Sequence, residues 1–426
     1  MVPDNGDGSI SRRRAFLIRA ARLIDGSGAS ATLDPVVVVE DGMITGMFAG
    51  RVPEGAAPAD ALVIDLPGQT LLPGLIDCHV HLNFPADGTS LEDWMTEPDG
   101  VLQTYSTLAA QTALQAGITT IRDNGSRGNT AFDLRRAVER CNAPMPRMLL
   151  CGQPVTMTGG HTWPLGGEAD GVEGVRRRVR QLAKDGADWI KVMATGGGTR
   201  NTMSWKASYS AAELAAIVDE AHNLSRKVTV HCLSARGIEG AIEAGADQIE
   251  HASFFVDGAG HQEFEPAVAE KMASSGIAVT PTLSVRAFVV KTIESEAHRS
   301  PQRQAELDHW RLMLDGGLKQ FNLMSQMGVN FVAGTDAGWM YSPFDALAEE
   351  MALMNEGGVP AVDVIAAATG KVAAVLGIGD RTGRLGVGME ADIISVAADP
   401  LQDLRGLNQV AMVMSRGRLI SDGRTP

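Results

Sequence analysis

Two histidines separated by one residue come directly after an apolar run, in the stretch Leu71-Leu-Pro-Gly-Leu-Ile-Asp-Cys-His-Val-His81. Side chains alternate across a strand, so His79 and His81 are expected to point to the same side of it. Two neutral imidazole nitrogens that converge at a strand end favour a divalent metal site. A pair of hydrogen-bonded core histidines is the alternative, and a lone His-x-His does not distinguish the two.

Further residues able to bind metal stand at or just beyond the ends of other apolar runs. These are His161, His231, His251 and Asp336. Each has an ordinary interpretation when taken alone, as a loop residue, a core histidine or a helix cap. The remaining histidines, in helical or polar stretches, are interpreted as surface residues; they are His222, His261, His298 and His309.

Lys191 is unusual because it lies inside the apolar run Trp189-Ile-Lys-Val-Met193. Burial disfavours the charged ammonium and lowers the pKa of a lysine, which favours the neutral amine. A neutral amine can react with carbon dioxide. The resulting carbamate offers anionic oxygens that can bridge two metal ions, whereas an ammonium group cannot bind metal.

Eight short apolar runs alternate with helix-length stretches through the middle of the chain, which predicts an α/β fold with parallel strands joined by helices. The predicted strands are 71–80, 117–122, 147–151, 187–193, 227–231, 246–251, 277–282 and 329–335. Ser210 and Glu213 form a capping-box pattern that opens a helix over 214–224. Eight such units indicate a (β/α)8 TIM barrel, in which the strands' carboxyl ends meet at one mouth. The candidate metal ligands should therefore come together there.

Both ends of the chain carry shorter strand patterns. Residues 16–24, 35–45 with an Asp41-Gly42 turn, and 61–65 precede the barrel pattern, and residues 392–396 and 410–420 come after it. We expect a small composite β-sandwich domain over 1–70 plus 383–426, and a barrel over 71–382. The stretch Ser11-Arg-Arg-Arg-Ala-Phe-Leu17 resembles a twin-arginine export signal, but arginines interrupt the apolar residues after it, so it is interpreted as the start of a strand.

Composition narrows the classes of partner. The 426 residues carry a formal net charge of -14, which argues against nucleic acid or an anionic membrane as a partner and favours a small-molecule substrate. No run reaches the roughly 18 apolar residues of a membrane span. The four cysteines form no CxxC pair, which favours a reducing, cytoplasmic location.

The combined motifs resemble the amidohydrolase superfamily. They are Pro73-Gly-Leu-Ile-Asp-Cys-His-Val-His81, Lys191, His231, Ile249-Glu-His251 and Gly334-Thr-Asp336. The chain is most similar to the imidazolonepropionase-like and prolidase-like branch, which includes Xaa-Pro dipeptidases and ochratoxin-degrading enzymes. Homo-oligomers are frequent among such proteins, so one is expected here.

The resemblance implies two divalent metal ions, with zinc the best match and manganese, cobalt or iron as alternatives. His79, His81 and Asp336 would hold one ion, His231 and His251 the other, and carboxylated Lys191 would bridge them. Asp336 would act as general base and then general acid, while His161 would polarise the substrate carbonyl.

Substrate choice is less determined. Dipeptidase-like relatives commonly have an aromatic residue two positions after the histidine of the fifth strand, but this chain has Leu233. Arg200 or Arg236 could anchor a substrate carboxylate instead, or could be a solvated loop residue. The stretch 199–209, with Trp205, is expected to form a lid or to pack at a subunit interface.

Hydrolysis of an N-acyl amino acid or dipeptide-like amide is the leading expectation. The first alternative is cleavage of apolar aryl amides, carbamates or ureas. The others are opening of a cyclic amide, deamination, and a non-catalytic barrel.

Overall fold

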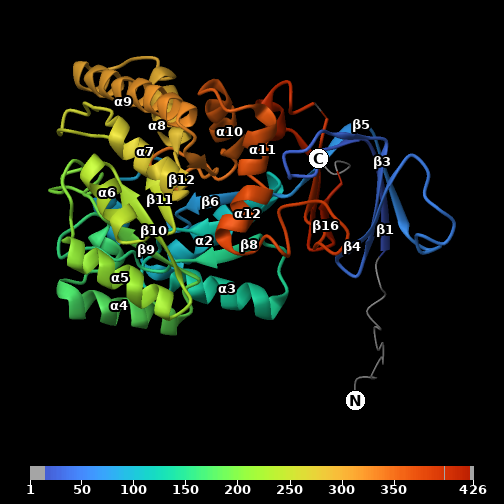
Figure 1. Ribbon diagram of the computed structural model, residues 1–426, viewed down its shortest axis with the longest axis horizontal. Coiled ribbons are helices and arrows are strands. Elements are labelled where there is room, and N and C mark those ends of the chain that lie inside the picture. The colour runs from blue at the N-terminus through green and yellow to red at the C-terminus, as the bar shows by residue number, and fades with distance from the viewer. Residues whose placement is uncertain (1–14, 398, 423–426) are drawn as a thin grey trace.

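The computed structural model describes residues 15–397 and 399–422 (Figure 1). Strands from both ends of the chain lie together at one side of the molecule, and helices surround parallel strands at the other. The first four residues of the twin-arginine-like stretch, residues 11–14, lie outside the described part. Its continuation is strand β1 (Ala15–Leu23), as predicted for residues 16–24.

The terminal segments form one eight-stranded sheet with the order β16-β15-β14-β5-β1-β3-β4, and β2 pairs with β1. The further strands of this sheet are β2 (Thr32–Leu33), β3 (Pro35–Glu40), β4 (Met43–Ala49), β5 (Leu62–Pro73), β14 (Ile393–Val396), β15 (Val410–Ser415) and β16 (Arg418–Ser421). Asp41 and Gly42, both with positive φ, make the predicted turn between β3 and β4. The β-sandwich stays a prediction, because the pairing describes a single sheet.

The central strands run parallel and divide into two sheets. One sheet contains β6 (Leu75–Val80), β7 (Ile118–Asp123) and β8 (Arg147–Leu150). The other contains β9 (Trp189–Met193), β10 (Lys227–Cys232), β11 (Gln248–His251), β12 (Ala278–Thr280) and β13 (Asn330–Phe331). Isolated parallel bridges, Val80 to Ala337 and Val155 to Val192, connect the two sheets at both edges. Regular pairing is not continuous around the strands, so the closed barrel also stays a prediction.

The first predicted strand, residues 71–80, is in fact two strands. Leu71 to Pro73 end β5 and pair with β14 of the terminal sheet, and β6 begins at Leu75. Gly74 separates them because a Cβ atom there would collide with the Thr119 side chain, so the chain can pass this point only without a side chain.

The helices follow the alternation predicted from sequence. They are α1 (Leu91–Thr96), α2 (Asp99–Gln115), α3 (Thr130–Cys141), α4 (Gly171–Asp185), α5 (Ala211–Asn223), α6 (Ala235–Glu243), α7 (Pro266–Ser275), α8 (Leu283–Glu294), α9 (Pro301–Gln326), α10 (Leu347–Glu356), α11 (Ala361–Ala367) and α12 (Gly370–Leu376). The capping box is confirmed, since the Ser210 hydroxyl accepts from the Glu213 amide and the Glu213 carboxylate accepts from the Ser210 amide. Within the described ranges, no helix is long and apolar enough to span a membrane.

Candidate active site

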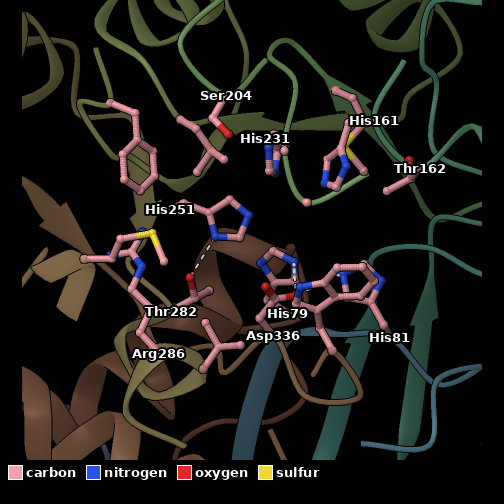
Figure 2. A pocket seen from close by; sticks show the side chains of 18 of the residues that line it. His79, His81, His161, Thr162, Ser204, His231, His251, Thr282, Arg286 and Asp336 are labelled. Atoms are coloured by element: carbon pink, nitrogen blue, oxygen red, sulfur yellow. Dashed lines mark hydrogen bonds and ion pairs between the residues drawn. The ribbon is translucent and has the colours of Figure 1, made fainter. Parts of the chain in front are cut away.

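A cavity of about 290 Å³ lies where the parallel strands end (Figure 2). Its walls include every metal-binding candidate from the sequence, namely His79, His81, His161, Lys191, His231, His251 and Asp336. These residues are far apart in the chain, but they come from the ends of neighbouring strands or the loops after them. The structure therefore brings the predicted cluster together.

The first donor group is formed by His79, His81 and Asp336. The Nε2 atoms of His79 and His81 lie 3.3 and 3.1 Å from Oδ1 of Asp336. Neighbouring ligand atoms around a tetrahedral zinc ion lie about 3.3 Å apart when each bond is about 2.0 Å long. The three side chains thus have the spacing of ligands that share one ion.

The remaining histidines continue the cluster across the cavity. The ring of His251 lies 5.1 Å from that of His79 and 4.6 Å from that of His231, which in turn lies 4.6 Å from His161, all between ring centroids. Donor atoms of His79, His251 and Asp336 all lie within 4.8 Å of one another. This group joins the two ligand sets predicted from sequence, so the sets form one continuous cluster.

Each ring is held through one nitrogen, which leaves the other for a metal ion. His81 contacts the Gly125 carbonyl through Nδ1 at 3.3 Å, and His251 contacts the Thr282 hydroxyl through Nδ1 at 2.7 Å. His231 uses Nε2 instead, 3.1 Å from the Gly196 carbonyl. Such partners fix the orientation of metal-binding histidines.

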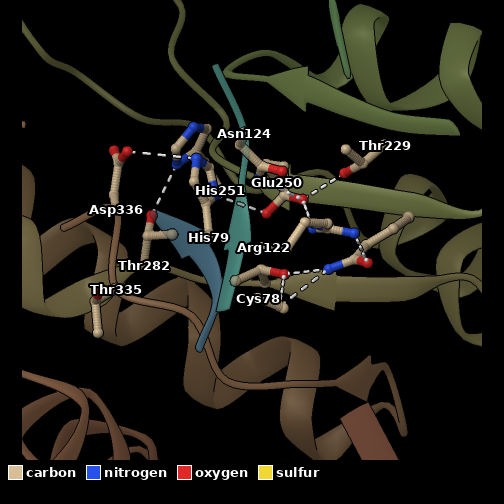
Figure 3. Close-up of polar contacts among 12 residues, drawn as sticks. Cys78, His79, Arg122, Asn124, Thr229, Glu250, His251, Thr282, Thr335 and Asp336 are labelled. Atoms are coloured by element: carbon tan, nitrogen blue, oxygen red, sulfur yellow. Dashed lines mark hydrogen bonds and ion pairs between the residues drawn. The ribbon is translucent and has the colours of Figure 1, made fainter. Parts of the chain in front are cut away.

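His79 is held by a buried charged network (Figure 3). Its Nδ1 lies 2.8 Å from Oε2 of Glu250, and Oε1 of Glu250 accepts a 2.6 Å hydrogen bond from Arg122. Burial alone would raise the pKa of Glu250, but His79 and Arg122 together hold it well below its usual value. Glu250 is therefore a charged partner that aims Nε2 of His79 at Asp336.

Lys191 is buried without any hydrogen-bond partner for Nζ among the described residues, and 1% of the residue is exposed. Burial lowers the pKa of this lysine. A buried polar atom without a partner is costly unless something else satisfies it. The environment thus suits a neutral amine that can be carboxylated.

The histidines are also held neutral, as metal binding requires. Burial, and then the charge of Lys191, lowers the pKa of His79 to about 4 and that of His161 to about 3. For Asp336, burial alone would raise the pKa. His79 and His81 outweigh this effect and hold the pKa well below the usual value, so the side chain is a carboxylate.

Several site residues have left-handed backbone conformations, with φ of 70° at His251, 49° at Thr282 and 59° at Asp336. Residues other than glycine rarely adopt such values, which persist where the surroundings enforce them, often at functional sites. All three residues stand where a strand has ended, so the strain turns their side chains toward the cavity.

The substrate-contact candidates are placed unequally. Leu233 lines the cavity. The Arg200 side chain is 79% exposed and lies 3.4 Å from Glu92, and Arg236 is exposed on α6. Trp205 packs against Gly258, which itself lines the cavity. Neither arginine is thus placed to anchor a substrate in this cavity.

Sequence reasoning missed four contributors. Arg122 and Glu250 are charged residues inside apolar strands, the same signal that identified Lys191, and that signal could have found them. Arg286 and His309 line the cavity from helices α8 and α9, so the interpretation of His309 as an ordinary surface residue was wrong. Neither has a local sequence signal, because helix contacts across the fold place them.

Comparison with known proteins agrees with this site. A family model for the Amidohydrolase family matches residues 70–420. The chain belongs to the amidohydrolase family. It is 29% identical to ochratoxinase from Aspergillus niger, over 93% of this chain and 84% of that protein. Imidazolonepropionase from Chloroflexus aggregans is 24% identical, over 84% of each chain.

Solved amidohydrolase structures extend the agreement to the fold. A Xaa-Pro dipeptidase with methionine bound in the active site superposes with a TM-score of 0.82 at 28% identity, covering 96% of this chain and all of the other. The structure of A. niger ochratoxinase gives 0.81 at 26% identity, covering 97% of both chains. The family resemblance drawn from sequence is thereby confirmed. Amidohydrolases generally use a divalent metal, and the buried group of His79, His251 and Asp336 fits one.

Proposed function

We propose that this protein uses two divalent metal ions to hydrolyse an amide-type carbon–nitrogen bond of a small molecule, an N-acyl amino acid or dipeptide-like amide first. The convergence of five histidines, Asp336 and Lys191 on one cavity supports the proposal most strongly. A barrel scaffold with its mouth at this cavity is part of the same proposal.

In the proposed centre, His79, His81 and Asp336 hold one ion, and His231 and His251 hold the other. Carboxylated Lys191 bridges them, and its otherwise unpartnered Nζ supports this assignment. Zinc suits histidine and carboxylate-type ligands best. When bound, such ions act as Lewis acids and lower the pKa of water toward about 7.

The chain's own residues handle the protons. Asp336 is an ionised carboxylate at the cavity wall, so it can accept the proton that water loses on attacking the carbonyl carbon. The same proton then passes from Asp336 to the leaving nitrogen as the carbon–nitrogen bond breaks. Neutral His161, held by the Thr199 hydroxyl 2.9 Å from its Nδ1, is placed to stabilise the carbonyl oxygen as negative charge develops.

The preference for an amino-acid product rests on a relative. The Xaa-Pro dipeptidase at 28% identity holds methionine, a free amino acid, in its active site. Leu233 on the cavity wall favours the second candidate class, the apolar aryl amides, carbamates and ureas. Cyclic amides, deamination and a non-catalytic barrel remain further from these observations. A cytoplasmic location and a homo-oligomeric state stay predictions.

The experiment that tests the function combines metal analysis with a substrate panel. Protein purified without chelator should contain about two ions per chain. It should release amine from N-acyl amino acids, aryl amides, carbamates or ureas. Absence of bound metal, or turnover that persists after metal removal, would contradict the proposed mechanism.

The role of Asp336 gives the first mutational prediction. Asp336→Asn keeps the shape of the side chain but weakens it as a proton acceptor. We expect metal to remain bound and kcat to fall by about 10²–10⁴-fold. Exposed Asp345→Asn serves as the matched control and should leave kcat unchanged. Near-normal turnover of the Asp336 variant would remove its assigned role.

A further inference from the structure

The cavity contains a buried cation that the proposed chemistry does not use. Arg286 on α8 is 7% exposed and lines the cavity, and its Nη2 donates a 2.7 Å hydrogen bond to the Ser253 hydroxyl. Within the described part of the chain, it has no carboxylate within ion-pair distance. Burial lowers the pKa of Arg286 to about 10, so the guanidinium stays positive at neutral pH.

The position of Arg286 is fixed by its surroundings. The Glu350 carboxylate accepts hydrogen bonds from the amides of Leu283 and Ser284 at 3.0 and 2.7 Å and so anchors the first turn of α8. The guanidinium lies 5.7 Å from the Phe255 ring centroid, and its Nη1 occupies the space where Gly317 of α9 lacks a side chain. Arg286 is therefore a preorganised cation. Holding it in a low-dielectric wall is costly unless an anion pairs with it.

The wall around Arg286 is otherwise largely apolar, with Leu233, Phe255, Val285, Trp310 and Met313. Figure 2 shows Arg286 on the side of His251 and Thr282, away from His81 and His161. A ligand with a carboxylate at Arg286 and an apolar body along this wall would extend toward the histidine cluster. A guanidinium suits such a carboxylate because it can donate two parallel hydrogen bonds.

We propose that Arg286 binds the carboxylate of the substrate and so selects N-acyl amino acids or dipeptide-like amides with an apolar side chain. The inference rests on the proposed function and deepens it, because it names the group that recognises the substrate class. It assigns to α8 the role that sequence reasoning offered to Arg200 or Arg236.

The test compares two substrates that differ only in the carboxylate, N-acetyl-L-methionine and N-acetyl-3-(methylthio)propylamine. In the metal-loaded enzyme, Arg286→Met should lower kcat/KM for the acyl amino acid about 30-fold or more, mainly through KM. Turnover of the decarboxylated analogue should be unchanged or improved, and Arg286→Lys should retain part of the preference. Arg236→Met is the matched control and should behave as wild type.

Gly317→Ala provides a variant that keeps the arginine itself. The added methyl group displaces Nη1 and should raise KM for N-acetyl-L-methionine selectively, by less than the loss of the guanidinium does. Equal losses on both substrates in the Arg286 and Gly317 variants would indicate a structural role and overturn the proposal.

A binding measurement separates this inference from the proposed function. L-methionine should raise the unfolding temperature of the wild-type holoenzyme more than 3-(methylthio)propylamine does, and Arg286→Met should abolish the difference. If the panel of amides is not cleaved but this difference is seen, the hydrolytic proposal fails and the carboxylate site stands. If amides are cleaved without any preference for the carboxylate, the hydrolase stands and the Arg286 proposal fails.

Discussion

Lys191 and Arg122 are both fully buried on the parallel strands, but their surroundings differ. Arg122 donates to Glu250 at 2.6 Å and to Gln248 at 2.9 Å, so its charge is neutralised inside the protein. Lys191 has no such partner among the described residues. The same cost of burial thus produces a stable ion pair in one case and an amine suited to modification in the other.

Lys191→Met tests this difference. The variant keeps the buried volume but cannot form a carbamate, so we expect fewer metal ions per chain and a fall in turnover of about 100-fold or more. In protein prepared with ¹³C-bicarbonate, a carbamate carbon signal should be seen by NMR for the wild type and be absent from the variant.

Lys227→Met on neighbouring β10 is the control for the Lys191 variant. Its Nζ donates to the Val375 carbonyl at 2.7 Å, and this lysine does not line the cavity. Full metal content in the Lys191 variant would show that the lysine is not a ligand.

At the scale of elements, α8 is placed by contacts at its first turn. Thr282 precedes the helix and holds His251 through a 2.7 Å contact, while Glu350 of α10 accepts the first two helix amides. The helix thereby joins the metal cluster to the Arg286 wall. Glu350 provides these contacts while fully buried, and burial raises its pKa from 4.5 to about 7.

The raised pKa of Glu350 predicts a pH dependence of stability. The unfolded chain releases this proton near pH 4.5 and the folded protein near pH 7, so the folded state binds more protons between these values. Stability from this group is therefore present below pH 4.5 and is lost as the pH rises to about 7. Relative to wild type, Glu350→Gln should have a smaller fall in unfolding free energy between pH 4.5 and 7.

Urea unfolding of both proteins at pH 5 and pH 8 measures this difference. Exposed Glu270→Gln on α7 serves as the control and should show the wild-type change. An identical pH response of wild type and the Glu350 variant would mean that Glu350 is already ionised at pH 5.

At the scale of the whole molecule, an ion pair ties the parallel strands to the terminal sheet. Arg147 at the start of β8 lies 2.5 Å from Glu390 and 3.1 Å from Asp392, just before β14. The Arg147 side chain is 12% exposed and that of Asp392 1%, so solvent screens this contact weakly. The terminal sheet and the site-bearing strands are thus electrostatically coupled.

Arg147→Met should lower the free energy of unfolding by about 3 kcal/mol, because it leaves a buried carboxylate without its cation. Urea denaturation measures the change. Arg136→Met breaks an ion pair whose side chains are 70% and 43% exposed, and it should cost less than about 1 kcal/mol. Equal effects of the two substitutions would show that Arg147 does not couple the two parts.

The order of strands and helices and the identity of the candidate ligands could be predicted from the amino-acid sequence alone. These features have local signals: apolar periodicity, the Ser210 capping box, and polar residues placed where apolar runs end. Because the carboxyl ends of parallel strands meet at one edge, His79, His231 and Asp336 could be expected near one another without coordinates.

Tertiary contacts determine which other residues reach the site. Glu250 contacts His79 across neighbouring strands, and Arg286 reaches the cavity because Glu350 and Gly317 from distant helices place it. Gly74 likewise ended the first predicted strand through contact with Thr119. Such contacts depend on which elements pack side by side. That information is absent from local periodicity and emerges only when the chain is folded.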